Sequence, residues 1–152
     1  MIEIYVDADA CPVKDEIYRV ADRHKLKVYI VSNGFMRLPQ SPLIERILVD
    51  EGPDVADDWI AEHATSDDIA ITADIPLAAR CVENNVTTIA PTGKLFTEDN
   101  IGMSLATRNL MADIRSASNT QTYNAEFSKQ DRSNFLQALE NAVQALKRRG
   151  GP

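Results

Sequence analysis

Short apolar runs alternate with amphipathic helical patterns between residues 2 and 89, and this alternation restricts the fold more than any other feature of the chain. The runs are rich in β-branched residues, whereas the segments between them repeat apolar residues every three or four positions. Consecutive parallel strands need a crossover, which is usually a helix. The alternation therefore predicts a three-layer α/β protein whose mostly parallel central sheet has about five strands.

The expected strands and helices leave no room for a second domain. Strands are expected over 2–6, 26–31, 44–49, 68–72 and 86–89. Helices are expected over 12–24, 54–64 and 75–84, and extra C-terminal helices over 101–115 and 128–149, with a polar loop at 116–126 between them. A chain of 152 residues has the usual length of one domain, which we place at residues 1–149 with a short tail at 150–152.

Polar side chains follow three of the expected strands. Asp7 and Asp9 come directly after the first strand, Asn33 after the second and Asp74 after the fourth. Right-handed crossovers place the carboxyl ends of these strands along one edge of the sheet, where open α/β folds bind their ligands. Carboxylates gathered there are hard oxygen ligands that suit Mg²⁺ or Mn²⁺. A divalent ion at this edge could activate water and stabilise charge on a phosphoryl group.

Further acids lie near the starts of a helix and a strand. Asp54, Asp57 and Asp58 begin the helix after the third strand, where they could join the site or simply favour the helix dipole. Asp67 and Asp68 precede the fourth strand, so we expect a solvated turn at the opposite end of the sheet.

Cations near the expected strand-end loops are candidates for phosphate binding. Arg37, Lys94 and Arg108 could contact a phosphate, with Asn33 beside them, although each alone also fits a surface salt bridge. The formal net charge of −7 excludes a bulk nucleic-acid binder that works through a global positive field. A polyanionic substrate would therefore need metal ions and a local basic patch.

The cysteines and the lack of a long apolar segment indicate the cellular compartment that we expect for the protein. Cys11 and Cys81 show no metal-ligand spacing, so we expect free, reduced thiols. No signal-peptide pattern or membrane-length apolar run occurs, which predicts a cytoplasmic protein without membrane contact. The sequence allows a homo-oligomer but does not specify one.

Two motifs resemble a known family. The segment Asp57-Asp-Trp-Ile-Ala-Glu-His-Ala64, followed by Ile69-Ala-Ile-Thr72-Ala-Asp74, resembles the second half of a PIN-like nuclease domain. With Val6-Asp7-Ala-Asp9-Ala-Cys-Pro-Val13, the chain resembles the uncharacterised bacterial YaiI/YqxD family from residue 1 to about residue 148.

The resemblance implies a PIN-like fold and a metal-dependent ribonuclease that hydrolyses RNA phosphodiesters with one or two divalent ions. By position, Asp7, Asp57 and Asp74 match the metal-binding acids, and Asp9 and Asp58 are close enough to assist. The family itself has no settled activity.

The chain departs from the pattern of its apparent relatives in two places. Only Glu45 and Glu51 are candidates for the usual second acid of PIN-like domains. The segment 121–124 stands where a Gly-Gly-Pro stretch is expected before the last helix.

Three other classes of protein share part of the pattern. A HAD-like phosphatase would use Asp7 as a nucleophile, and the Asp7-x-Asp9 spacing imitates its motif. A response-receiver domain would be phosphorylated on Asp50, with Lys94 after the fifth strand. A non-catalytic module that binds RNA or protein would keep the PIN-like fold with a degenerate site.

Overall fold

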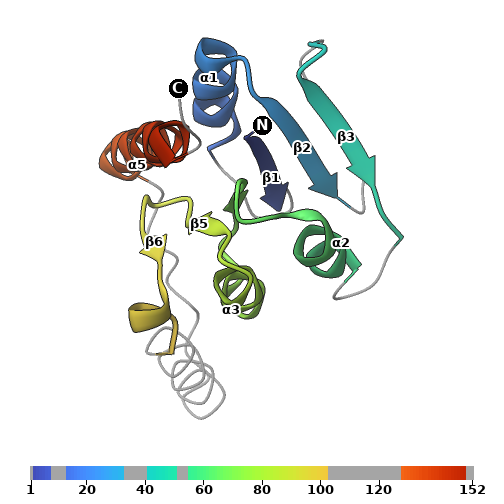
Figure 1. Cartoon of the computed structure of the whole chain (residues 1–152). Coiled ribbons are helices and arrows are strands. Elements are labelled where there is room, and N and C mark those ends of the chain that lie inside the picture. The colour runs from blue at the N-terminus through green and yellow to red at the C-terminus, as the bar shows by residue number, and fades with distance from the viewer. Residues whose placement is uncertain (1, 8–12, 33–40, 51–54, 103–127, 150–152) are drawn as a thin grey trace, which may run out of the picture.

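The β-prone runs form one sheet in the computed structural model, which describes residues 2–7, 13–32, 41–50, 55–102 and 128–149. The strands are β1 (Glu3–Asp7), β2 (Lys27–Ser32), β3 (Ile44–Leu48), β4 (Ile69–Ile71), β5 (Thr87–Ile89) and β6 (Leu95–Phe96). The helices are α1 (Lys14–His24), α2 (Val55–His63), α3 (Ile75–Glu83) and α5 (Lys129–Arg149). Figure 1 shows how the helices are arranged around the sheet.

The described strands form a six-stranded sheet in the order β3-β2-β1-β4-β5-β6. Neighbours from β3 to β5 pair in parallel, and β6 alone pairs antiparallel, with β5. The three-layer α/β prediction is therefore confirmed, with β6 as an added strand. Because β6 has only two residues, it is too short for a periodic pattern to predict it.

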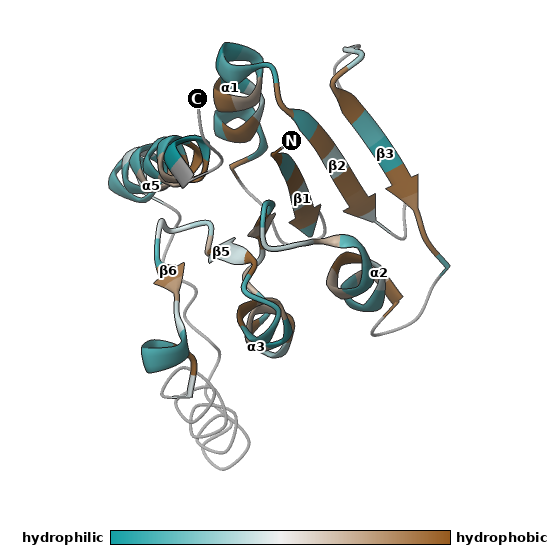
Figure 2. Cartoon of the chain, in the orientation of Figure 1, coloured by the Kyte–Doolittle hydropathy of each residue, from teal (hydrophilic) through white to brown (hydrophobic). Residues whose placement is uncertain are grey.

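Alternation along the strands divides the core into two layers. Ile4 and Val6 face one cluster together with the apolar residues of α1 and α5, whereas Tyr5 faces a second cluster with those of α2 and α3. Most of β1 and β2 is coloured hydrophobic in Figure 2, and their buried residues divide between the two clusters, as expected for a sheet covered by helices on both sides. The sheet is therefore the middle layer, with α1 and α5 on one face and α2 and α3 on the other.

Helix α5 begins at a capping box formed by Ser128 and Asp131. The Ser128 backbone N–H donates to Asp131 Oδ2 at 3.1 Å, and the Asp131 N–H donates to Ser128 Oγ at 3.0 Å. Four apolar residues spaced along one side of α5 are buried against the sheet: Phe135, Leu139, Val143 and Leu146. The predicted helix over 128–149 is confirmed, and it buries one apolar side.

The turn between β5 and β6 presses against the start of α5. Gly93 has φ of +95°, and a Cβ atom there would lie 2.7 Å from the carbonyl carbon of Asn134. Only glycine meets both the backbone angle and the close approach without strain. This contact places Lys94, the next residue, beside the first turns of α5.

The expected helix over 101–115 is described only at its beginning, where residues 98–102 are helical. Thr97 and Asn100 cap it: each backbone N–H donates to the other side chain, at 2.9 and 3.2 Å. The rest of this helix and the expected loop at 116–126 lie outside the described residues.

Candidate active site at the carboxyl edge of the sheet

Asp7 ends the strand that lies at the centre of the sheet. Strand β1 pairs with β2 on one side and with β4 on the other, so Asp7 lies between two further strand ends. Its exposure is only 9%, and Ser32 at the end of β2 is buried as well. A carboxylate is rarely buried to this degree unless other groups compensate its charge.

The Thr72 hydroxyl connects Asp7 to the segment that follows β4. It donates to Asp7 Oδ2 at 2.9 Å and accepts the backbone N–H of Asp74 at 3.0 Å. Thr72 itself is 1% exposed, and its backbone N–H donates to the carbonyl of Ile89 on β5 at 3.2 Å. The structure thus brings Asp7 and the Asp74 backbone together through one fixed hydroxyl.

Asp74 also begins α3. Its Oδ1 accepts the backbone N–H of Leu77 at 3.0 Å, so Asp74 is the N-cap of this helix, and Pro76 follows in the first turn. Aspartate is among the best N-cap residues, and proline fits the first turn because its missing N–H needs no partner there. One oxygen of Asp74 therefore has a structural task in addition to any role in the site.

Asp57 and Asp58 lie in the first turn of α2, as predicted. Asp58 Oδ1 forms an ion pair with Arg80 Nη1 of α3 at 2.7 Å. The pKa of Arg80 is raised, mainly by this hydrogen bond and further by the charges of Asp58 and Asp57, whereas desolvation acts in the opposite direction. Both acids therefore influence α3, although the Asp58–Arg80 pair is half exposed and adds little stability.

Cys81, next to Arg80, is fully buried. Burial is the main cause that raises the pKa of its thiol to about 11, and the negative charge of Asp57 acts in the same direction. A thiol with this pKa stays mostly protonated at neutral pH, which disfavours Cys81 as a nucleophile. Its expected free state is confirmed.

The expectation that Asp68 lies in a solvated turn is wrong. Asp68 precedes β4 at the opposite edge of the sheet, as predicted, but it is 3% exposed and therefore does not belong to a solvated turn. Its Oδ1 accepts the N–H of Glu3 at 3.1 Å, and its Oδ2 accepts the backbone N–H and the hydroxyl of Thr65 at 2.8 and 2.9 Å. Asp68 thus ties the start of β1 to the turn before β4.

Part of the predicted site falls outside the described residues. Asp9, Asn33, Arg37 and Arg108 lie there, and so do Asp54 and Glu51. Within the described ranges, no three metal-binding side chains lie close enough to hold an ion by themselves. Lys94 is described, and its ammonium lies 5.6 Å from the centre of the Phe96 ring.

Thr72 is the site residue that reasoning from the sequence overlooked. The Thr-x-Asp spacing after a strand was a signal, because a buried hydroxyl two residues before an N-cap can accept its N–H. The hydrogen bond to Asp7 could not be foreseen without the pairing of β1 with β4.

The fold and these contacts define a three-layer α/β protein with acidic residues at the carboxyl edge of its parallel sheet. The chain belongs to the family described as "Uncharacterized BCR, YaiI/YqxD family", whose model matches residues 5–145.

Its relatives share most of their length with it. A UPF0178 protein of Rhodopseudomonas palustris strain TIE-1 is 58% identical over 149 residues, which cover 98% of this chain and 94% of the relative. A UPF0178 protein of Parvibaculum lavamentivorans is 55% identical over 152 residues and covers both chains completely. No solved structure matches the chain. Among the described residues, no helix combines the length and the apolar character that a membrane span requires.

Proposed function

We propose that the chain is a divalent-metal-dependent nuclease that hydrolyses RNA phosphodiester bonds at the carboxyl edge of β1 and β4. The observation that carries the proposal is the buried carboxylate of Asp7, held by the Thr72 hydroxyl that also accepts the N–H of Asp74. Burial of an acid at a strand end costs stability, and a cation that binds there offsets the cost.

The donor set suits Mg²⁺ or Mn²⁺. Asp7 and Asp74 offer hard carboxylate oxygens on adjacent parallel strand ends, and the N-cap bond uses only Oδ1 of Asp74. Magnesium ions typically bind one or two carboxylates and complete their coordination with water and substrate phosphate, so two described acids are sufficient. Asp9 would complete the site. Asp57 and Asp58 are further proposed ligands that would have to move closer when an ion binds, because Asp7, Asp57 and Asp74 do not form a three-ligand cluster among the described residues.

The chain's own residues would fix and orient the site. Thr72 holds one Asp7 oxygen in place, and the capped start of α3 fixes Asp74. A bound divalent ion would lower the pKa of a water molecule and stabilise negative charge on the phosphoryl oxygens. Lys94 would contact the RNA backbone. Asn33, Arg37 and Arg108 are further proposed phosphate contacts, because the sequence places them near the loops at the strand ends.

The test is hydrolysis of a fluorescently labelled single-stranded RNA with Mg²⁺, with Mn²⁺ and with a chelator. We expect cleavage with either ion, no cleavage with the chelator, and a large loss of cleavage in Asp7→Asn. Asp22→Asn is the matched control, because this carboxylate is 81% exposed at the far end of α1. Equal activity in the two variants would remove Asp7 from the mechanism. Covalent phosphate on Asp7 after incubation with a phosphomonoester would instead favour the HAD-like alternative.

A further inference from the structure

Helices α1 and α5 lie side by side and run in the same direction. Arg132 contacts Glu16 near the starts of the two helices, whereas Glu140 contacts Arg23 and His24 near the end of α1. Since α1 follows β1, its start lies at the carboxyl edge of the sheet. The Glu16–Arg132 pair therefore lies at the same edge as Asp7.

Packing supports this placement. Phe135, one turn after Arg132 on α5, is fully buried in the same cluster as Val13 and Val6, which precede α1 and Asp7 respectively. The contact between Gly93 and α5 brings Lys94 to the same region. Arg132 thus places a cation at the same edge of the sheet as Asp7.

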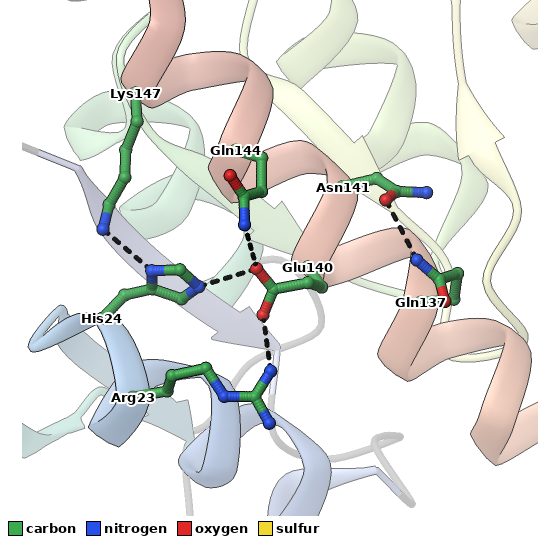
Figure 3. A network of polar contacts seen from close by, with 7 residues as sticks. All are labelled: Arg23, His24, Gln137, Glu140, Asn141, Gln144 and Lys147. Carbon is green, nitrogen blue, oxygen red and sulfur yellow. Dashed lines mark hydrogen bonds and ion pairs between the residues drawn. The ribbon is translucent and has the colours of Figure 1, made fainter.

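The second contact between the two helices shows what a structural ion pair looks like in this fold (Figure 3). Glu140 Oε1 accepts from Arg23 at 3.0 Å, and its Oε2 contacts His24 at 2.8 Å and accepts from Gln144 at 2.9 Å. Burial acts to raise the pKa of Glu140, but the hydrogen bonds from Gln144 and His24, together with the charges of His24 and Arg23, outweigh it and lower the pKa. Lys147 Nζ lies 2.8 Å from the other His24 nitrogen, Nδ1. Both oxygens of this carboxylate are satisfied.

The Glu16–Arg132 contact is different. Arg132 Nη1 lies 3.4 Å from Glu16 Oε1, and the two side chains are 42% and 14% exposed. Glu16 Oε2 is buried and, within the described part of the chain, has no hydrogen-bond partner. A buried carboxylate oxygen without a hydrogen-bond partner costs stability, so packing alone does not explain Glu16.

We infer that Arg132 binds a phosphate of the RNA substrate next to the scissile bond, and that Glu16 is a positioning residue that holds the guanidinium in place. This inference rests on the proposed function. Guanidinium is planar and always charged, and its paired N–H groups match two phosphate oxygens. A chain with net charge −7 needs such a local cation to bind a polyanion.

The experiment compares Arg132→Ala and Arg132→Lys with Arg148→Ala, which changes an exposed arginine at the opposite end of the same helix. Steady-state cleavage of single-stranded RNA is measured between about 50 and 200 mM salt, because the affinity contributed by phosphate contacts falls steeply with salt over this range. Loss of one phosphate contact is expected to raise KM about tenfold with little change in kcat, and to reduce the salt slope by about 0.7. The KM of Arg132→Lys should lie between those of wild type and Arg132→Ala. The KM and salt slope of Arg148→Ala should match those of wild type.

Glu16→Gln tests the positioning role. It should raise KM less than Arg132→Ala does, and it should add nothing in the Glu16→Gln/Arg132→Ala double variant, because both changes act through one guanidinium. Thermal melts of all variants identify any loss of folding. Wild-type cleavage with an unchanged KM and salt slope in Arg132→Ala would overturn the inference and leave the proposed function intact. A folded wild type that neither binds nor cleaves RNA would overturn both.

Discussion

Replacement of Thr72 by valine is the most informative single change at the acidic edge. Valine keeps the shape of threonine but removes the hydroxyl that donates to Asp7 Oδ2 and accepts the N–H of Asp74. A hydrogen bond to a charged group is worth about 1.5–3 kcal/mol, and the part-buried Asp74 N–H that loses its acceptor adds about 0.5–1.5 kcal/mol. Because these terms overlap, we expect the free energy of unfolding to fall by about 3 kcal/mol.

Thr72→Ser is the matched control, because it keeps the hydroxyl and loses one methyl group, worth about 0.8 kcal/mol. The assay is urea denaturation of wild type and both variants in metal-free buffer at pH 7. Since groups that orient a metal ligand typically contribute 10-fold or more to affinity, Thr72→Val should also weaken Mn²⁺ binding at least about tenfold. Equal losses of stability in the two variants would show that packing of the methyl group, and not the hydroxyl, is what matters, and would refute the reasoning.

Three further predictions concern residues away from the acids. Gly93→Ala should destabilise the protein by about 2 kcal/mol or more in urea denaturation, because its Cβ would meet Asn134 and its φ is positive. Asp68→Asn should cost about 1–3 kcal/mol in the same assay, since an amide group would face donors such as the Glu3 N–H; an unchanged urea midpoint would contradict this account. Glu140 has a lowered pKa in the folded state, so its ionised form stabilises the fold above the unfolded pKa of about 4.3 and this contribution is lost as the pH falls through the folded value. Glu140→Gln should therefore lower stability at pH 7 and flatten its decline in acid, measured by thermal melts between pH 2 and 7.

Most of the fold could be predicted from local patterns. Strand β1, the helix over Val55–His63 and the amphipathic α5 each carry a periodicity or a capping signal that their own residues supply. Strand β6 was missed because its two residues pair with β5 only after the Gly93 turn reverses the chain. Whether such a short strand forms depends on its pairing with another strand, and a short stretch of sequence carries no signal for that pairing.

The place of Asp7 and Asp74 in the fold could be predicted from the sequence, but only part of their contacts could. Asp7 and Asp74 were expected at one edge because both follow parallel strands, and the structure adds that these two strands are neighbours. The link through Thr72 and the pairing of Asp58 with Arg80 depend on side-chain directions across 65 and 22 residues, which spacing cannot supply. Asp68 shows the same limit, because its burial depends on the backbone of Glu3.

The measurement that tests the central claim most directly is calorimetric titration of Mn²⁺ into wild type and into the Asp7→Asn/Asp74→Asn double variant. Asparagine caps helices as well as aspartate does, and its carbonyl oxygen can still accept the Thr72 hydroxyl, so the variant should remain folded. The account predicts binding in wild type that is lost in a folded double variant. No wild-type binding at millimolar Mn²⁺, or equal binding in both proteins, would contradict a metal site at this edge and favour a non-catalytic binding module.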